Sequence, residues 1–233
     1  IVRDESRVTQ LDRIAVGAAL QLAEELIAAR QSPGGPAAVE TTRRVRVMSE
    51  AIEAELKRLI DSRYNHPCIV MWVPFNEGWG QYQTERIADW IKKYDPSRLV
   101  NNTSGWEDRG VGDVYDMHQY PGPDMYPLSD TRASVLGEFG GLGLPLKGHT
   151  WQDEKNWGYR SFENADKLTA AYLDLIEKLV PLKNRGLAAA VYTQTTDVEI
   201  EVNGLMTYDR AVIKMDADRI AAANRRLYGE PAK

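Results

Sequence analysis

The 233-residue sequence contains one cysteine, Cys68, so no disulfide can form within the chain. This excludes a small disulfide-stapled scaffold but leaves secretion open. No run of about 18 apolar residues occurs, so the sequence predicts no transmembrane helix. The first residues, Ile1-Val2-Arg3-Asp4-Glu5, lack the apolar stretch of a signal peptide. Together these absences leave the compartment undetermined.

The sequence also lacks any block of like charge. Its formal net charge is −5, and basic and acidic residues are interleaved along most of the chain. A nucleic-acid partner or a membrane-surface partner is therefore not expected. Hydrophobic residues make up 43% of the chain, which is enough for a sizeable core in a globular protein.

The signatures of several other chemistries are missing too. The three histidines, His66, His118 and His149, do not have the spacing of zinc ligands. The glycine-rich segment 137–143 is not followed by Gly-Lys-Ser/Thr, which argues against a phosphate loop. No Gly-x-Ser-x-Gly elbow is present, which argues against a serine hydrolase. We therefore predict neither a metal nor a cofactor.

One acidic pattern leaves an alternative open. Asp197, Glu199 and Glu201 alternate, and on an extended segment they would share a face that could bind a hard cation through oxygen. A solvated edge, or pairing with a basic residue such as Arg210, explains the same pattern without a metal.

Residues 1–47 differ from the rest and are predicted to be a helical extension and linker. Apolar residues recur at helical spacing from Leu11 to Arg30, and the breaker Ser32-Pro33-Gly34-Gly35-Pro36 comes next. Thr41–Val47 is a basic stretch for which no order is predicted. A second helix is expected from Ser49, as its N-cap, to Tyr64.

From Cys68 onward, five apolar strands are each followed by a polar or glycine-rich cluster. The predicted strands are 68–73, 99–102, 114–118, 134–138 and 188–192, with helices at 84–94, 165–183 and 213–228. The first strand is predicted to be buried on both faces. This alternation implies an α/β fold with a parallel sheet, and a (β/α)8 TIM barrel builds its active site at the carboxyl ends of its strands. We therefore expect residues 48–233 to form an apparently incomplete barrel.

Two glutamates stand at the ends of these strands. Glu77 comes after the first strand, and Glu138 ends the fourth. In one barrel both would project into the same mouth. A retaining glycosidase uses such a pair at roughly 5 Å, one carboxyl group attacking the sugar and the other protonating the leaving oxygen. Their surroundings must keep one ionised and the other protonated. A surface carboxylate is the alternative for each residue alone.

Aromatic residues gather in the same loops. Sugar rings present C–H faces that stack on aromatic rings, whereas simple loop packing is the alternative for each residue. The residues are Trp72, Trp79, Trp106, Tyr120, Trp151, Trp157 and Tyr192.

Two strand motifs resemble those of glycoside hydrolase family 2, the β-galactosidase and β-glucuronidase family. The segment Asn65-His66-Pro67-Cys68-Ile69 through Asn76-Glu77 is similar to the family's fourth-strand motif, whose glutamate is the acid/base. Leu136-Gly137-Glu138-Phe139-Gly140 resembles the seventh-strand motif, whose glutamate is the nucleophile. Segments 192–199 and 203–210 resemble the end of the eighth strand and the segment after that strand.

The resemblance implies a retaining hydrolase of terminal β-linked sugars, with Glu77 as acid/base and Glu138 as nucleophile. Asn76 would then bind the sugar 2-hydroxyl, although it could also cap the next helix. Tyr120 would hydrogen-bond the nucleophile. His118 would line the same pocket, unless it is a satisfied structural group. Trp106 and Trp151 are candidate sugar platforms, and Tyr192 is a further candidate contact.

The resemblance covers about Glu50 to Asp216 and implies only strands 4 to 8 of the barrel. The family's β-sandwich domains and first three barrel strands have no counterpart in the sequence. Two alternatives to an active enzyme therefore stay open: an inactive carbohydrate-binding fragment, and a half-barrel that pairs with a second copy or a complementing chain. The identity of the sugar is not encoded in these motifs.

Overall fold

The computed structural model describes residues 35–78 and 80–228, and the chain divides into two compact units between Pro67 and Cys68. The predicted helix at Leu11–Arg30 and the candidate sugar contact Trp79 lie outside the described residues. Among the described residues, no helix combines the length and apolar character needed to cross a bilayer.

The described part of the first unit is dominated by one long helix, α2 (Pro36–Arg63). The predictions that a helix begins at Ser49 and that residues 41–47 lack order are both wrong, because α2 runs through this region without a break. The predicted boundary between the N-terminal extension, residues 1–47, and the barrel segment therefore lies inside α2. The Ser49 hydroxyl donates to the Val45 carbonyl within the helix instead of capping it.

Local chemistry explains why the helix begins early. Pro36 is compatible with a first helical turn, where the missing N–H has no partner to lose. Within the basic stretch, Arg43 pairs with Glu40 and Arg46 with Glu50, at spacings of three and four residues that place each pair on one helix face.

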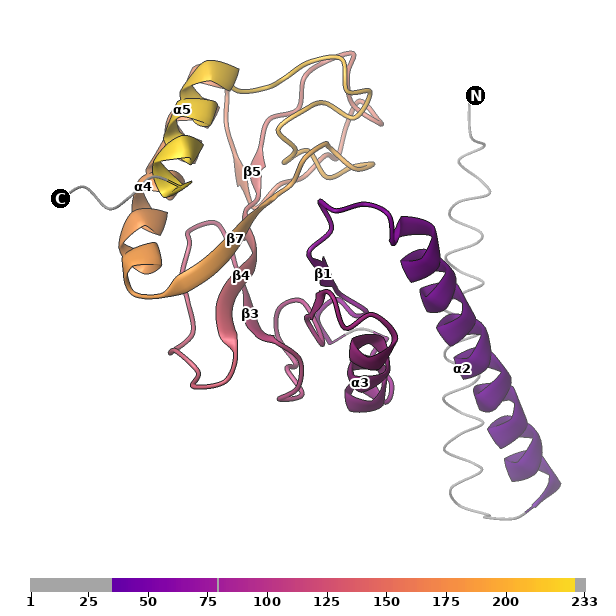
Figure 1. The fold of residues 1–233 in the computed structure, drawn as a ribbon. Helices are drawn as coiled ribbons and strands as arrows, with labels where there is room; N and C mark the ends of the chain where they lie inside the picture. Colours follow the sequence, from indigo (N-terminus) through magenta and orange to yellow (C-terminus); the bar gives the residue numbers. More distant parts are fainter. Residues whose placement is uncertain (1–34, 79, 229–233) are drawn as a thin grey trace. The chain divides into compact units, whose positions relative to one another are not determined.

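The second unit alternates strands with helices (Figure 1). Its strands are β1 (Met71–Trp72), β2 (Leu99–Val100), β3 (Val114–Gln119), β4 (Ala133–Gly140), β5 (Leu142–Gly143), β6 (Arg160–Ser161) and β7 (Leu187–Thr193). Its helices are α3 (Thr84–Tyr94), α4 (Ala165–Asn184) and α5 (Ala217–Tyr228). The short strands β5 and β6 lie in the loop for which the sequence predicted no element.

Among the described residues, neighbouring strands in each sheet follow the order of the chain, and the paired strands are parallel. β1 pairs with β2, and β4 lies between β3 and β7 in a three-stranded sheet. The Asp113 N–H donates to the Val100 carbonyl at 2.8 Å and links the start of β3 to β2. The expected α/β fold with parallel strands is thus confirmed.

The first strand is more exposed than predicted. The predicted strand 68–73 was expected to be buried on both faces, yet Trp72 of β1 is buried while Val70, directly before β1, is 66% exposed. Within the described residues β1 has one neighbouring strand, β2, which leaves its other edge open. β7 is open in the same way beyond β4, and its residues 188–191 are exposed.

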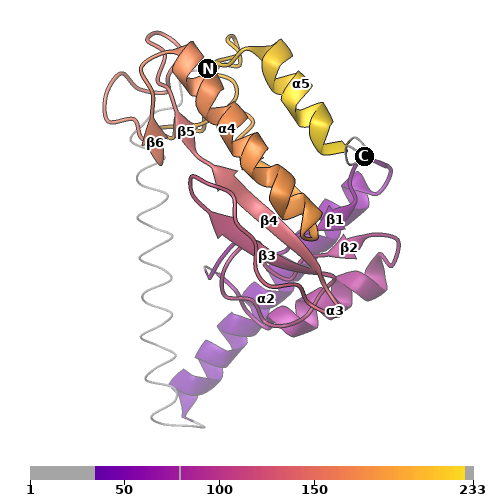
Figure 2. The ribbon, with the colours of Figure 1, turned by 90° about the vertical axis from the view of Figure 1, so that its left-hand side faces the viewer.

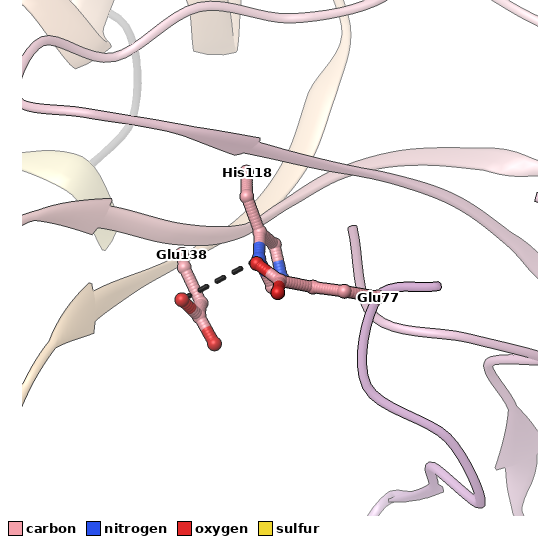
Figure 3. Close-up of side chains that lie close together, drawn as sticks. All are labelled: Glu77, His118 and Glu138. Carbon is pink, nitrogen blue, oxygen red and sulfur yellow. Dashed lines mark hydrogen bonds and ion pairs between the residues drawn. The ribbon is translucent and has the colours of Figure 1, made fainter. Parts of the chain in front are cut away.

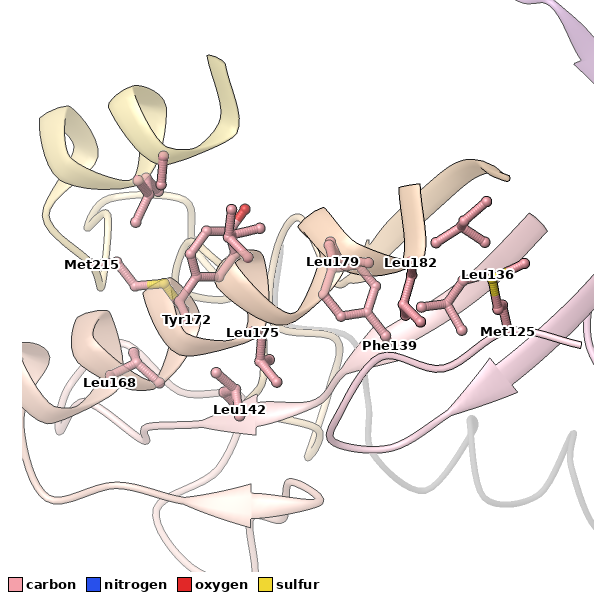
Figure 4. Packing of buried hydrophobic residues seen from close by; sticks show 14 of the residues in the cluster. Met125, Leu136, Phe139, Leu142, Leu168, Tyr172, Leu175, Leu179, Leu182 and Met215 are labelled. Atoms are coloured by element: carbon pink, nitrogen blue, oxygen red, sulfur yellow. The ribbon is translucent and has the colours of Figure 1, made fainter. Parts of the chain in front are cut away.

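The main core lies between the three-stranded sheet and α4, with α5 packed against α4 (Figure 2). The buried residues of α4 recur at helical spacing and meet Leu136 and Phe139 of β4 (Figure 4). The cluster contains Met125, Leu136, Phe139, Leu142, Leu144, Leu168, Tyr172, Leu175, Ile176, Leu179, Leu182, Leu187, Met215, Ile220 and Ala223.

A buried carboxylate holds β1 against the end of α3. Asp95 comes directly after the last residue of α3, and its oxygens accept hydrogen bonds from Trp72 Nε1 and Arg98 Nη1, both at 2.8 Å, and from the backbone N–H and hydroxyl of Ser97. Burial favours the neutral form of the acid, but these hydrogen bonds outweigh burial and lower the pKa of Asp95 to about 2. The contact fixes the strand that leads into Glu77.

We expect Asp95→Asn to lower the free energy of unfolding by about 1–3 kcal/mol. Both carboxylate oxygens of Asp95 accept hydrogen bonds, whereas the amide of Asn has only one oxygen that can accept. Since folding lowers the pKa of Asp95 to about 2 from an unfolded value of about 3.9, its contribution is complete above about pH 4 and disappears as the pH falls toward 2. Urea unfolding at several pH values measures the difference. Asp89→Asn, on the exposed face of α3, is the matched control. Equal losses in both variants at neutral pH would contradict the role of Asp95.

Candidate active site

The loop after β1 positions Glu77 by pairing with the loop after β2. The backbone N–H of Glu77 donates to the Ser104 carbonyl at 2.7 Å, and the Thr103 hydroxyl donates to the Glu77 carbonyl at 2.9 Å. Asn76 forms a parallel bridge with Ser104. Asn76 is not a cap of α3, because that helix begins at Thr84 after Gln83.

A β-bulge in β4 positions Glu138. Met117 pairs with Leu136 and His118 pairs with Glu138, so Gly137 is an extra residue with no partner on β3. Strict alternation would place Leu136 and Glu138 on one face and Phe139 on the other. The extra residue instead allows both Leu136 and Phe139 to join the core while Glu138 points away from it.

Only glycine fits at the bulge. The Gly137 N–H donates to Asp116 Oδ1 at 2.8 Å, and a Cβ added to this residue would lie 2.3 Å from the same oxygen. Asp116 is buried, and its second oxygen accepts from Asn101 Nδ2 at 2.5 Å. Burial raises the pKa of Asp116, and the hydrogen bonds from Gly137 and Asn101 oppose that shift.

The imidazole of His118 lies between the two glutamates (Figure 3). Its Nδ1 is 3.0 Å from Glu77 Oε1 and 3.4 Å from Glu138 Oε2. The His118 side chain is 3% exposed, whereas those of Glu77 and Glu138 are 23% and 29% exposed. The carboxyl groups thus reach solvent while the histidine between them is shielded from it.

The other edge of the imidazole meets the loop after β2. Its Nε2 is 2.8 Å from Ser104 Oγ. Gly105 has a φ of +88°, and a Cβ there would lie 2.8 Å from the His118 ring. The backbone of Gly105 therefore packs against the ring and fixes its orientation.

Tyr120 lies on the other side of Glu138. Its hydroxyl donates to Glu138 Oε2 at 2.5 Å, and its ring stacks on that of Tyr159 with a centroid separation of 3.7 Å. Burial, together with the hydrogen bond to Glu138, raises the pKa of Tyr120. Tyr120 therefore stays protonated and serves as a donor to the carboxylate over the physiological pH range.

Sequence reasoning missed Tyr159, which belongs to this cluster. Partial burial, followed by the charges of Glu201 and the two site glutamates, raises the pKa of Tyr159. Trp157 meets the Tyr159 ring edge-on at 5.4 Å, and both aromatic side chains are exposed. The β5–β6 ladder ties this segment beside the end of β4. The sequence signal was the Trp-Gly-Tyr run in the long loop, but no periodicity indicated which ring faces the glutamates.

Two further aromatic candidates, Trp106 and Trp151, lie in different settings. Trp106 is exposed and packs beside Gly78, next to Glu77, because a Cβ on Gly78 would lie 2.5 Å from its ring. Trp151 packs edge-on against Tyr208 in a separate pair.

Tyr192 was expected to contact the substrate, but its ring lies in the core. It packs edge-on against Phe139 and Tyr172, and burial raises the pKa of its hydroxyl. The register of β7 against β4 explains this, since Tyr192 pairs with the core-facing Phe139 rather than with Glu138.

Ligand atoms of Glu77, His118 and Glu138 lie within 4.8 Å of one another, which is close enough to surround a cation. The same atoms already interact through hydrogen bonds and ion pairs with each other and with Tyr120. The acidic alternation at Asp197 has a different explanation, because Lys214 Nζ lies 2.6 Å from Asp197 Oδ1 in a buried ion pair. The alternative that a basic residue pairs with this acidic segment is confirmed at Asp197, but the base is Lys214 rather than Arg210.

Residues 27–132 match the family described as "Glycosyl hydrolases family 2, TIM barrel domain". This segment contains Glu77, His118 and Tyr120. The matched segment resembles a fragment of the glycoside hydrolase family 2 barrel domain.

Curated β-galactosidases match over part of the chain. A β-galactosidase of Klebsiella pneumoniae is 38% identical over 64 residues, which cover 28% of this chain and 6% of the relative. A β-galactosidase of Aeromonas hydrophila subsp. hydrophila is 29% identical over 123 residues, covering 45% of this chain and 12% of the relative. The matches thus span a small fraction of the length of these curated relatives.

A solved structure also supports the barrel fold. A β-glucuronidase from an uncultured Clostridium sp. superposes with a TM-score of 0.50 at 15% sequence identity, covering 77% of this chain and 35% of that one. At this identity the likeness concerns the fold alone. Together with the family match, it supports a (β/α)8 fold for the strands that carry the site.

We expect Gly137→Ala to lower the free energy of unfolding by about 1–3 kcal/mol, because its methyl group would overlap the buried Asp116 carboxylate. Urea unfolding followed by circular dichroism measures this loss. Gly122→Ala is the matched control, since a Cβ there meets nothing within 4 Å, and a change within about 0.5 kcal/mol is expected. Equal midpoints for Gly137→Ala and the parent chain would show that the bulge tolerates a side chain.

Proposed function

We propose that the chain carries the catalytic centre of a retaining β-glycosidase, with Glu77 as acid/base and Glu138 as nucleophile. The observation that carries the proposal is the meeting of two partly exposed carboxyl groups at one buried imidazole. One oxygen of each glutamate lies within 4.8 Å of the other. This fits the short separation of roughly 5 Å used by retaining enzymes better than the roughly 6.5–9.5 Å of inverting ones.

In this mechanism the first step joins the sugar to Glu138. The ionised carboxylate attacks the anomeric carbon while Glu77 protonates the departing glycosidic oxygen. In the second step Glu77, now ionised, takes a proton from water, and the resulting hydroxide releases the sugar from Glu138. Tyr120 donates to Glu138 Oε2 and would hold the nucleophile in position.

The neighbouring side chains suit a carbohydrate. Exposed Trp106 lies beside Glu77, and the exposed rings of Tyr159 and Trp157 lie on the Glu138 side. Such rings offer apolar faces for the C–H surface of a sugar. Asn76, directly before Glu77, is the candidate partner of the sugar 2-hydroxyl. β-Galactosides and β-glucuronides are the first substrates to test, because relatives are named for acting on them.

We expect the purified chain to hydrolyse at least one aryl β-glycoside in a panel of sugars. Glu138→Gln should abolish turnover, and Glu77→Gln should reduce it by about 10²–10⁴-fold, the usual contribution of general acid catalysis. Glu85→Gln, an exposed acid in the first turn of α3, should leave turnover unchanged. A 2-deoxy-2-fluoro glycoside should leave a covalent adduct on Glu138, detected by peptide mass spectrometry.

Two outcomes would contradict this assignment. An adduct on a residue other than Glu138 would move the nucleophile elsewhere. A folded chain that binds sugars but hydrolyses none would favour the alternative of an inactive carbohydrate-binding fragment.

An open sheet edge favours a partner for the barrel. β7 is an outer strand of its sheet within the described residues, and the side chains at 188–191 along it are exposed and apolar. An unpaired apolar strand edge favours association. We therefore propose that a second copy or a complementing chain covers β7.

Light scattering of the purified chain should give a mass above the 26.2 kDa of one chain, and Val191→Lys should reduce association by placing a charge on the β7 edge. Val39→Lys, at another exposed valine on α2, is the control. A monodisperse monomer that hydrolyses glycosides would show that the edge needs no partner.

A further inference from the structure

Ser104 makes the second hydrogen bond of the histidine that lies between the glutamates. Its Oγ is 2.8 Å from His118 Nε2, while His118 Nδ1 faces Glu77 Oε1 at 3.0 Å. A neutral imidazole carries one N–H, so one of its nitrogens donates and the other accepts. A serine hydroxyl can donate or accept a hydrogen bond. The groups that face Nδ1 and Nε2 therefore decide together which nitrogen carries the proton.

The atoms around Nδ1 favour a proton on that nitrogen. Both neighbours, Glu77 Oε1 at 3.0 Å and Glu138 Oε2 at 3.4 Å, are carboxyl oxygens. A lone pair on Nδ1 would face two acceptors, whereas an N–H can donate to them. Nε2 then holds the lone pair and accepts the hydroxyl hydrogen of Ser104.

Asp116 offers the competing arrangement. In that arrangement the Ser104 hydroxyl would donate to the Asp116 carboxylate, whose pKa Ser104 and His118 help to lower, and would accept from Nε2–H. Asp116 already accepts from the Gly137 N–H at 2.8 Å and from Asn101 Nδ2 at 2.5 Å. Each carboxylate oxygen can accept a second hydrogen bond, so it is the pair of carboxyl oxygens at Nδ1 that favours the Nδ1–H form, with Ser104 donating to Nε2.

We propose that Ser104 is a positioning residue that locks His118 in the Nδ1–H tautomer and thereby keeps the catalytic proton of Glu77 on Oε2. The inference rests on the proposed roles of Glu77 and Glu138. When Nδ1–H donates to Glu77 Oε1, that oxygen must act as an acceptor, so a proton on Oε1 would face the hydrogen of Nδ1. The acid therefore carries its proton on the oxygen that His118 does not contact, where it can be transferred to the leaving group.

The opposite tautomer would impair the acid. With the proton on Nε2, the lone pair of Nδ1 would accept from a protonated Glu77 Oε1 and draw its proton away from the substrate. Gly105 adds to the constraint, since its backbone packs against the ring and prevents the imidazole from turning to another partner.

Nitrogen-15 NMR of histidine-labelled protein tests the tautomer without any need for turnover. The chain has three histidines, so His66→Gln and His149→Gln variants assign the His118 signals. We expect the Nδ1–H form in the parent chain and in Ser104→Thr, and a shift toward the Nε2–H form in Ser104→Ala. An Nε2–H form or an imidazolium in the parent chain at neutral pH would overturn the proposal.

Kinetics test the consequence for the acid. For alkyl or phenyl β-glycosides, whose leaving groups need a proton, kcat/KM of Ser104→Ala should fall about 10–100-fold, which is part of the roughly 10²–10⁴-fold contribution of general acid catalysis. For dinitrophenyl glycosides, which need little protonation, kcat/KM should stay within about twofold, because the loss is confined to proton transfer. Ser104→Thr keeps the hydroxyl and should restore the parent values for both.

The outcomes separate this inference from the proposed function. An equal loss on both substrate classes would show a merely structural role for Ser104, and no loss on either would also overturn the inference, with the glycosidase assignment intact. If the parent chain hydrolyses no glycoside, the proposed function fails, and the NMR result still decides whether Ser104 sets the tautomer.

Discussion

The contact between Asp116 and the Gly137 N–H is the constraint on which the site depends. A buried carboxylate on β3 occupies the space that a side chain at position 137 would need, and it satisfies the backbone donor that the bulge leaves unpaired. The bulge then turns Glu138 away from the core while both of its apolar neighbours stay in it. One hydrogen bond therefore connects the packing against α4 with the direction of the candidate nucleophile.

The second glutamate reaches the same place by a different route. Glu77 lies on a loop rather than in a strand, and its backbone pairs with the loop after β2 at Ser104. That same serine contacts the far side of the His118 imidazole. The position of Glu77 and the hydrogen bonding of the histidine are consequently set by one residue, so a displacement of this loop would change both together.

Much of the second unit could be predicted from sequence, because its signals are local. The strands that contain Met117 and Leu136, and the helix that begins at Thr84, are indicated directly by apolar runs, periodicity and proline breakers. The meeting of Glu77 and Glu138 could be expected from the strand-end rule of parallel sheets. The early start of α2 at Pro36 was missed because the ion pairs that support it were read as a disordered charged stretch.

Tyr120 and Tyr192 show where sequence reasoning stops. Both tyrosines occur near strand ends, yet one donates to Glu138 and the other packs against Phe139 in the core. The difference arises from the extra residue in β4, which changes the residues that pair across the sheet. His118 of β3 pairs with Glu138, whereas Tyr192 of β7 pairs with Phe139. A bulge leaves no periodic signal in a single sequence, and so the face on which a neighbouring aromatic ring lies is set by the three-dimensional register rather than by its position in the chain.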